Sequence, residues 1–374
     1  MKYINEKEFE LSGILNWHNL GYTGKDVKIA NMETCNVDAW YFKKQVNDPF
    51  DNGREGQENS HGNQTLNVIH QVAPDAEFYT LPRGGSYSSK SVTGNLIEKS
   101  LPYMISEGIH LVSASVGGTN NKILNEAILN VQKHGTTFVS SAGNSGDRGA
   151  SPYAKSGVWI AIGAVVLNVR NEIKLTTYSS IDEEVDFVQF SEIYVNDVRK
   201  GYEDRVIYRS GTSFSSPLLV GMLALVQQFF YEKTGQYLNQ DKLYQFMVDN
   251  SIDLGDVGKD KEYGHGLFVL PNPEDIDIEK YIEGDFIKIP ENDKDESNNS
   301  QRKIFKANIE SQLLDPGHFV IPFRGLFEAE NAEEINWGRD EKGKVWAEAI
   351  LPASKRRKIS VRQDSKDIVV EILE

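Results

Sequence analysis

The sequence predicts an α/β fold in which a mostly parallel central sheet is flanked by helices, followed by a small α+β domain. β-rich runs and helical runs follow one another through the first two thirds of the chain. The apolar run Leu218–Val226 predicts a helix that is buried on every face. A strongly acidic stretch and a change of composition at Lys303 then mark a second unit. We expect a short N-terminal extension at 1–13, a first domain at 14–274, a linker at 275–302 and a second domain at 303–374.

Composition bounds the class of protein. The 374 residues, 39% of them hydrophobic, suffice for a sizeable core and favour two domains. Forty Lys and Arg against 55 Asp and Glu give a formal charge of -15, which argues against nucleic acid or an anionic membrane as a partner. The single cysteine, Cys35, excludes an intrachain disulfide and fits a reducing compartment. With no signal sequence at Met1 and no run long enough to span a bilayer, we expect a soluble cytoplasmic protein, which lysis of the cell could release.

The elements of the first domain are predicted in order from their patterns and their turn residues. β-branched or alternating runs indicate strands, and longer amphipathic or apolar runs indicate helices. Strands are expected at 27–32, 77–81, 110–118, from 137 and at 158–164. Helices are expected from Ile14, after His61, at 91–107, at 122–133, from Pro217 to about 233 and at 239–250.

The segment Gly211-Thr212-Ser213-Phe214-Ser215-Ser216-Pro217 places a polar turn before the buried helix. Proline is tolerated in a first helical turn because its missing N–H would have no partner there. A hydroxyl at the mouth of such a helix lies among free backbone N–H groups and the positive end of the helix dipole, which favour an oxyanion. Ser213 is therefore a candidate nucleophile. The alternative is that these serines only cap the helix and pack closely.

This segment, with Gly221 after it, resembles the nucleophile motif of the subtilisin-like (subtilase) serine peptidases. The resemblance covers roughly 15–270 and implies their three-layer fold. It also implies a serine endopeptidase that cleaves polypeptides through an acyl-enzyme intermediate.

The strand at 27–32 ends at Glu33-Thr34-Cys35, where the family has Asp-[Ser/Thr]-Gly. Active groups lie at the carboxyl ends of parallel strands, so the resemblance implies that Glu33 is the catalytic carboxylate. A glutamate can still orient an imidazole and stabilise its cation. Asp26 and Asp38 are nearby substitutes, and in a decayed site Glu33 would be an ordinary acid at the end of a strand.

Ser60-His61-Gly62-Asn63-Gln64 resembles the family's His-Gly-Thr-His helix, which implies that His61 is the general base. Asn63 and Gln64 replace the threonine and the second histidine. The resulting order of acid, base and nucleophile along the chain is that of subtilisin.

Ser141-Ala142-Gly143-Asn144 resembles the strand that forms the family's oxyanion site, which implies that Asn144 donates to the oxyanion. The same resemblance assigns residues to substrate binding. A peptide would add as a strand beside Ser115, Val116 and Gly117, with Gly84 and Gly85 on a second edge. Ser141, Ala142 and Gly143 would line the pocket for the residue before the cleaved bond. The alternative for the glycine segment at 117–118 is a plain turn between sheet and loop.

No cofactor or metal is expected. The loop 48–60 is rich in acids and could hold Ca²⁺, but its spacing fits no calcium loop. The segment from Phe319 to Trp337 resembles a stalk or copper-amine-oxidase N-terminal-like domain. That resemblance implies a binding or spacing module with a possible cell-envelope ligand and no copper.

Three hypotheses follow. The first is an active serine endopeptidase with a Glu33-His61-Ser213 triad. The second is an impaired relative of the family that binds peptides without cutting them, because Glu33, Cys35 and Asn63 depart from the family pattern. The third is an envelope-binding protein whose second domain sets its biology and whose peptidase fold is a passenger.

Overall fold

The structure of this protein is a computed structural model in which two compact units can be distinguished, Met1–Glu283 and Gly284–Glu374. In the first unit it describes residues 4–33, 46–50, 61–81, 94, 96–199, 201–202 and 204–282. In the second unit it describes the backbone of residues 304–307, 334–339, 345–350, 358–364 and 367–373.

The first unit is built on a large sheet whose described strands run in the order β11-β12-β8-β6-β5-β4-β1-β3-β2, with β7 paired to β6. From β12 to β2 every neighbouring pair is parallel, while β11 and β7 pair antiparallel to their neighbours. The strands are β1 (Lys28–Asn31), β2 (Val46–Asn47), β3 (Glu77–Thr80), β4 (Leu111–Ala114), β5 (Thr137–Ser141), β6 (Ile160–Leu167), β7 (Ile173–Leu175), β8 (Phe187–Phe190), β11 (Ser251–Ile252) and β12 (Leu267–Phe268). A separate antiparallel pair joins β9 (Ile193–Asn196) to β10 (Val206–Arg209).

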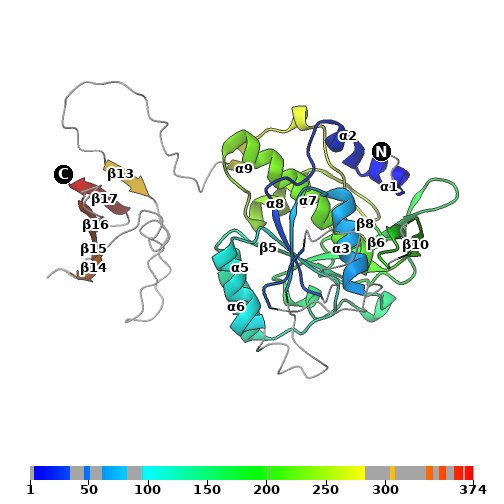
Figure 1. Cartoon of the computed structure of the whole chain (residues 1–374), viewed down its shortest axis with the longest axis horizontal. Helices are drawn as coiled ribbons and strands as arrows, with labels where there is room; N and C mark the ends of the chain where they lie inside the picture. The colour runs from blue at the N-terminus through cyan, green and yellow to red at the C-terminus, as the bar shows by residue number, and fades with distance from the viewer. Residues whose placement is uncertain are drawn as a thin grey trace. The chain divides into compact units, whose positions relative to one another are not determined.

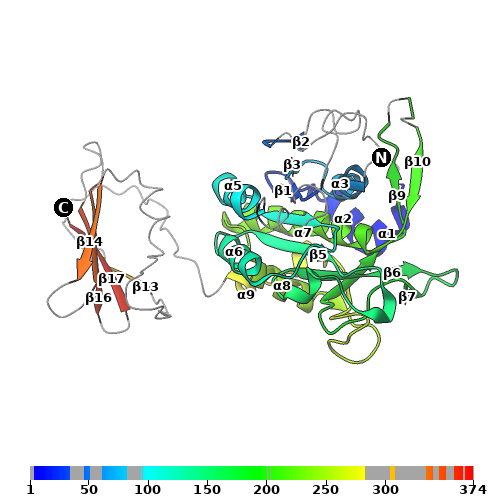
Figure 2. The ribbon, with the colours of Figure 1, turned by 90° about the horizontal axis from the view of Figure 1, so that it is seen from below.

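Helices cover both faces of this sheet (Figures 1 and 2). The α-helices are α1 (Glu6–Leu11), α2 (Ile14–Asn19), α3 (His61–Val72), α5 (Leu101–Glu107), α6 (Lys122–Gln132), α7 (Thr212–Thr234), α8 (Gln240–Asp249) and α9 (Glu279–Ile282). A π-helical turn η2 (Leu96–Ser100) leads into α5, and short 3-10 turns are η3 (Gly146–Arg148), η4 (Ala154–Ser156) and η5 (Pro273–Asp275). This arrangement confirms the three-layer α/β fold with a mostly parallel sheet.

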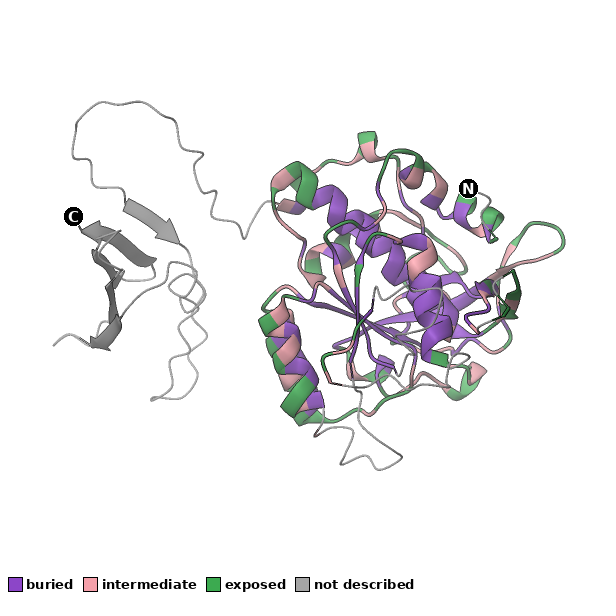
Figure 3. Ribbon diagram, in the orientation of Figure 1, coloured by how far each residue is buried: buried purple, intermediate pink, exposed green. Residues whose placement is uncertain are grey.

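The alternation of side chains along each strand divides the core in two. Ile29 of β1 and Val139 of β5 pack with α3, α7 and α8, whereas Ala30 and Phe138 pack with α5 and α6 on the other face. Because both faces are covered, the central strands are buried along their whole length, as Figure 3 shows for the sheet and for α7.

The helix α7 is the centre of the larger layer. It contacts β4, β5, β6 and β8 on one side and α3 on another, and its residues from Phe214 to Phe230 are buried. At Gly221 it comes so close to α3 that an added Cβ would lie 2.6 Å from the Cβ of Val72. A residue without a side chain is needed there because the backbone of α7 packs directly against the Val72 side chain of α3.

The expected start of this helix was wrong by about one turn. It begins at Thr212, so Ser213 lies inside the first turn and Pro217 lies inside the helix. Among the described residues, α7 is also the one helix long and apolar enough to cross a bilayer, although no run of the sequence was expected to be. Since 94% of its apolar window is buried in the unit, it forms the core.

Both ends of the first unit extend beyond the bounds expected for its folded part. Phe9 of α1, in the segment expected to be an extension, is 1% exposed, and the side chain of Asn5 bonds to the backbone N–H and C=O of Tyr194 on β9. Tyr281, in the segment expected to be a linker, packs edge to face on Phe230 and Phe246. Burial of these two aromatic rings stabilises the packing of both segments on the first unit.

The described part of the second unit is a sheet of five antiparallel strands in the order β13-β17-β16-β15-β14. The strands are β13 (Ile304–Ala307), β14 (Glu334–Arg339), β15 (Val345–Ile350), β16 (Lys358–Asp364) and β17 (Asp367–Leu373). The helix expected in this domain and most of the stalk-like segment lie outside the described residues. An envelope ligand therefore stays a prediction.

Two buried histidines make the first unit sensitive to acid. Burial lowers the pKa of His70 on α3 to about 4, and burial together with the charge of Lys28 lowers the pKa of His110 to about 4. The histidines of an unfolded chain have a pKa near 6.5. Between pH 6.5 and 4 the unfolded chain therefore binds protons that the folded chain does not bind. Their contribution to stability is present above pH 6.5 and is lost as the pH falls toward 4.

We expect the free energy of unfolding to be lower at pH 5.0 than at pH 7.5, by about 1–2 kcal/mol for each of these histidines. His70→Gln should flatten the dependence, whereas His134→Gln, a change at an exposed position, should leave it unchanged. Urea unfolding followed by far-UV circular dichroism, in a Ser213→Ala background that avoids self-digestion, measures this. Equal slopes for the parent and His70→Gln would contradict the assignment.

Candidate active site

Glu33 and His61 meet at the carboxyl edge of the sheet. Glu33 follows the end of β1, and His61 is the first residue of α3, so the strand and the helix each place one group at this edge. The Nδ1–H of His61 donates to Oε2 of Glu33. The Glu33 side chain is 6% exposed and that of His61 is 45% exposed, so the carboxylate is covered while the imidazole stays open to solvent.

Hydroxyl groups hold this carboxylate and its backbone. The Oγ1–H of Thr80 donates to the carbonyl oxygen of Glu33 at 2.7 Å, and that of Thr65 lies 3.3 Å from Oε1. The amide of Asn31 donates to the carbonyl oxygen of Gly62 at 3.1 Å, which joins the end of β1 to the first turn of α3. A buried carboxylate requires such partners, because an unpaired one would be costly to desolvate.

The alternative acids do not share this position. Asp26 lies before β1, at the opposite edge of the sheet, in a left-handed conformation with φ 63°. Asp38 lies outside the described residues, as does Cys35, where the family has glycine. Within the described part of the chain, Glu33 is therefore the carboxylate bonded to His61.

The nucleophile turn lies beside this pair. The ring of Phe214, the residue after Ser213, packs edge to face on the imidazole of His61 with 6.0 Å between ring centres. Ser213 itself is the second residue of α7, where a helix leaves its backbone N–H groups without intrahelical partners. Its N–H has no hydrogen-bond partner among the described residues.

Ser115, at the end of β4, provides a hydrogen-bond donor that α7 lacks because residue 217 is proline. Residue 217 of a regular helix would donate its N–H to the carbonyl of Ser213, and proline has none. The Oγ–H of Ser115 donates to that carbonyl oxygen at 2.9 Å instead. In return the Oγ of Ser213 lies 3.4 Å from the carbonyl oxygen of Ser115. The two serines thereby fix the first turn of α7 on the end of the sheet.

Asn144, after the end of β5, is locked in one orientation. Its Oδ1 accepts from the backbone N–H and from the Oγ1–H of Thr212, both at 2.9 Å. Since the backbone N–H can only donate, the oxygen must face Thr212 and the NH₂ group must face away from it. Gly211 has φ 124°, and a Cβ there would lie 3.4 Å from the Asn144 nitrogen. Glycine at 211 thus leaves the space beside that NH₂ group open.

The loop that contains Tyr178 and Ser180 also supports the nucleophile turn. The Tyr178 hydroxyl accepts from the N–H of Gly211 at 3.1 Å and lies 2.8 Å from the Oγ of Ser191. Its own carbonyl accepts from the N–H of Gly146, and Ser180 bonds to the carbonyl of Gly143. One loop therefore supports both the nucleophile turn and the loop that carries Asn144.

The residues expected to bind substrate differ in exposure. Gly117 is exposed and Val116 is half-buried, so the segment that follows β4 is accessible, although the carbonyl oxygen of Gly117 already accepts from the N–H of Tyr153. Ser115, Ser141 and Ala142 are buried, at 4%, 4% and 0% exposure. Gly143 is half-buried, with φ 114°. Gly84 and Gly85 lie outside the described residues.

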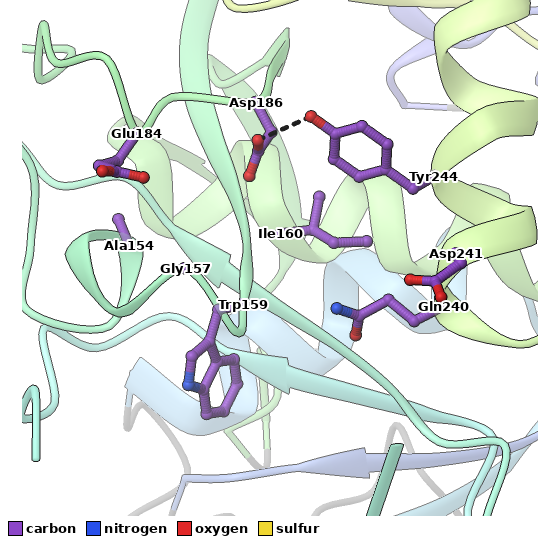
Figure 4. Close-up of a pocket in the computed structure, with 9 residues that line it drawn as sticks. All are labelled: Ala154, Gly157, Trp159, Ile160, Glu184, Asp186, Gln240, Asp241 and Tyr244. Carbon is purple, nitrogen blue, oxygen red and sulfur yellow. Dashed lines mark hydrogen bonds between the residues drawn. The ribbon is translucent and has the colours of Figure 1, made fainter. Parts of the chain in front are cut away.

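Within the described ranges, no group of three or more His, Cys, Asp and Glu side chains is placed to hold a metal ion. Most of the acidic loop 48–60 is not described. A polar cavity of about 270 Å³ occurs elsewhere, lined by Ala154, Gly157, Trp159, Ile160, Glu184, Asp186, Gln240, Asp241 and Tyr244 (Figure 4). It lies where β6 and β8 begin, at the edge of the sheet opposite the one that carries His61 and Asn144.

Sequence reasoning missed Thr65, Thr80 and Tyr178. Each acts through a contact with a residue far away in the chain, and a lone hydroxyl carries no local signal for such a contact. Ser115 was expected to bind substrate, and its bond to Ser213 became visible only once Pro217 was placed inside the helix.

Comparison with known proteins agrees with this geometry. The subtilase family (peptidase S8) matches residues 28–266. The chain is 26% identical over 272 residues to the minor extracellular protease Epr of Bacillus subtilis, a match that covers 66% of this chain and 38% of Epr. It is also 26% identical over 282 residues to the major intracellular serine protease of the same organism, covering 68% of this chain and 85% of that protein.

A solved structure has the same fold. The crystal structure of a lanthipeptide protease superposes with a TM-score of 0.59 at 18% identity, covering 70% of this chain and 92% of that one. The family match spans more than half of the residues and includes Glu33, His61, Asn144 and Ser213. The chain belongs to the subtilase family of serine peptidases.

Proposed function

We propose that this protein is a serine endopeptidase with a Glu33-His61-Ser213 triad in place of the usual Asp-His-Ser. The observation that carries the proposal is the bond from His61 to a covered Glu33 beside a nucleophile turn whose backbone is held by side chains. Asn144 and the N–H of Ser213 are proposed as the donors to the oxyanion.

The residue types fit the steps of acyl transfer. A serine hydroxyl is a weak nucleophile at neutral pH, so the Nε2 of His61 accepts its proton as Ser213 attacks the peptide carbonyl. Glu33 keeps the other ring proton on Nδ1 and stabilises the imidazolium. That imidazolium protonates the leaving amine, and water then hydrolyses the acyl-enzyme with His61 again as the base.

The assignment of the two oxyanion donors is supported by the fact that both are held in place before substrate binds. Thr212 holds the oxygen of Asn144, which leaves the NH₂ group for the substrate oxygen. The Ser213 N–H belongs to the first turn of α7, where the helix dipole also favours negative charge. Neither donor has to reorient when the charge develops.

The proposed substrate is a polypeptide that adds as a strand along Ser115, Val116 and Gly117. Ser141, Ala142 and Gly143 would form the pocket for the residue before the cleaved bond. No cofactor is assigned. By analogy with the relative named an intracellular serine protease, we propose that the protein acts in the cytoplasm.

The purified protein should hydrolyse unfolded polypeptide and become labelled by a fluorophosphonate probe. Ser213→Ala should lose both, because the attacking oxygen is gone, while its circular dichroism spectrum stays that of the parent. Mass spectrometry should locate the probe on Ser213. A parent protein that neither hydrolyses casein nor takes up the probe would refute the proposal and favour a peptide-binding relative without activity.

Substitutions at Glu33 test the acid of the triad. Glu33→Asp should remain folded and active at a reduced rate, because the shorter side chain still presents a carboxylate to His61. Glu33→Ala should lose most turnover, because nothing then orients the ring. Measurement of kcat and KM for the three proteins decides this. Equal kcat for the parent and Glu33→Ala would remove Glu33 from the mechanism.

Asn144→Leu should lower kcat by about 10²–10³ with little change in KM, because the lost bond forms mainly in the transition state. The magnitude is the one known for the corresponding donor of subtilisin, a member of this family. Thermal unfolding of the variant controls for the loss of the Thr212 bonds. An unchanged kcat in a folded variant would argue against this donor.

A further inference from the structure

Arg209 is a cation held beside the catalytic groups. It is the last residue of β10, four positions before Ser213. Its Nε–H donates to Oε1 of Gln64 at 2.6 Å, and its Nη1 donates to the carbonyl oxygen of Tyr208 at 3.0 Å. Gln64 is 9% exposed and lies on α3 three residues after His61. The bond joins segments 145 residues apart.

These contacts place the guanidinium of Arg209 on the side of the site that carries His61. Side chains three residues apart on a helix lie on the same face, with Cβ atoms about 5–6 Å apart, so the group bonded to Gln64 lies near the ring of His61. Four residues of extended chain span at most about 14 Å, which limits the distance between the Cα atoms of Arg209 and Ser213. Figure 2 shows β9 and β10 side by side next to α3. In the proposed mechanism His61 protonates the leaving amine, so a group near its ring would face the leaving-group half of a substrate.

The charge of Arg209 has no acidic partner among the described residues. The ion pairs there involve Lys28, Lys122, Lys155, Lys174, Arg199, Lys259, Lys280 and His61, and none involves Arg209. Its two described bonds, to a neutral amide and a neutral carbonyl, use two of the five N–H donors of a guanidinium. Arg209 is thus a half-buried arginine without an acidic partner among the described residues, in a chain with a formal charge of -15.

We propose that Arg209 binds a substrate carboxylate on the leaving-group side, so that the enzyme prefers peptides with Asp or Glu within the first three residues after the cleaved bond. The bond to Gln64 restricts the side chain before substrate arrives, which lowers the entropy cost of binding. The remaining donors of the planar group are suited to a carboxylate. Gln64, which replaces the family's second histidine, is then a positioning residue.

This inference rests on the proposed function for turnover, but carboxylate binding does not need cleavage. The test therefore has two arms. Peptides that differ only in Glu or Gln at each of the three positions, with amidated ends, are compared by kcat/KM with the parent and by Kd with Ser213→Ala. We expect the Glu peptide to be favoured about tenfold at one of these positions, and less at high salt.

Variants assign the preference. Arg209→Gln should bring the Glu/Gln ratio close to one. Gln64→Glu, which keeps the size of the side chain, should do the same, because it gives Arg209 a carboxylate partner within the protein. Arg170→Gln, a change in the exposed turn between β6 and β7, should keep the ratio of the parent. Gln peptides with a free or an amidated C-terminus distinguish a terminal carboxylate from a side chain.

Equal values for Glu and Gln peptides in both arms, or a preference that survives in Arg209→Gln, would overturn the inference. If the parent cleaves nothing but Ser213→Ala binds the Glu peptide more tightly through Arg209, the carboxylate site stands and the proposed peptidase activity falls. If the parent cleaves both peptides equally and the affinities are equal, the activity stands and the carboxylate site falls.

Discussion

The packing of α7 between the sheet and α3 is the constraint on which the rest of the structure depends. This helix is apolar on every side and contacts four parallel strands, so it cannot shift without exposing a large part of the core. Its first turn lies at the edge where β1, β4 and β5 end. The same burial that stabilises the domain therefore brings Ser213 to the edge that already carries Glu33 and Asn144, and the core and the site form one structure.

Partners for backbone polar groups explain why the nucleophile turn is so well defined. Tyr178 accepts from the N–H of Gly211, Asn144 accepts from that of Thr212, and Ser115 replaces the donor that Pro217 lacks. Buried backbone polar groups almost always have a hydrogen-bond partner. Each of these three side chains supplies that partner for one backbone group of the turn. Within the described residues the N–H of Ser213 has no such partner, and it is a group that the proposed mechanism assigns to the oxyanion.

Much of this arrangement could be predicted from the sequence, because it depends on local patterns. The parallel strands, the buried helix and the positions of Glu33, His61 and Asn144 at strand or helix ends follow from short motifs and their order. The start of α7 at Thr212 could not be predicted, since Pro217 signals a first turn unless a distant hydroxyl compensates for it. The docking of Phe9 and Tyr281, and the bond of Gln64 to Arg209, likewise depend on contacts between remote segments.

The close approach at Gly221 has a consequence for how the domain tolerates change. α3 carries His61 and α7 carries Ser213, and the two helices touch where an added methyl would meet Val72. A larger residue at 221 would push α3 and α7 apart. The displacement would extend along both helices to their first turns, which carry His61 and Ser213. The distance between the helices at this point thus sets the distance between base and nucleophile from about two to three turns away. Natural variation at 221 and 72 would be expected to be coupled.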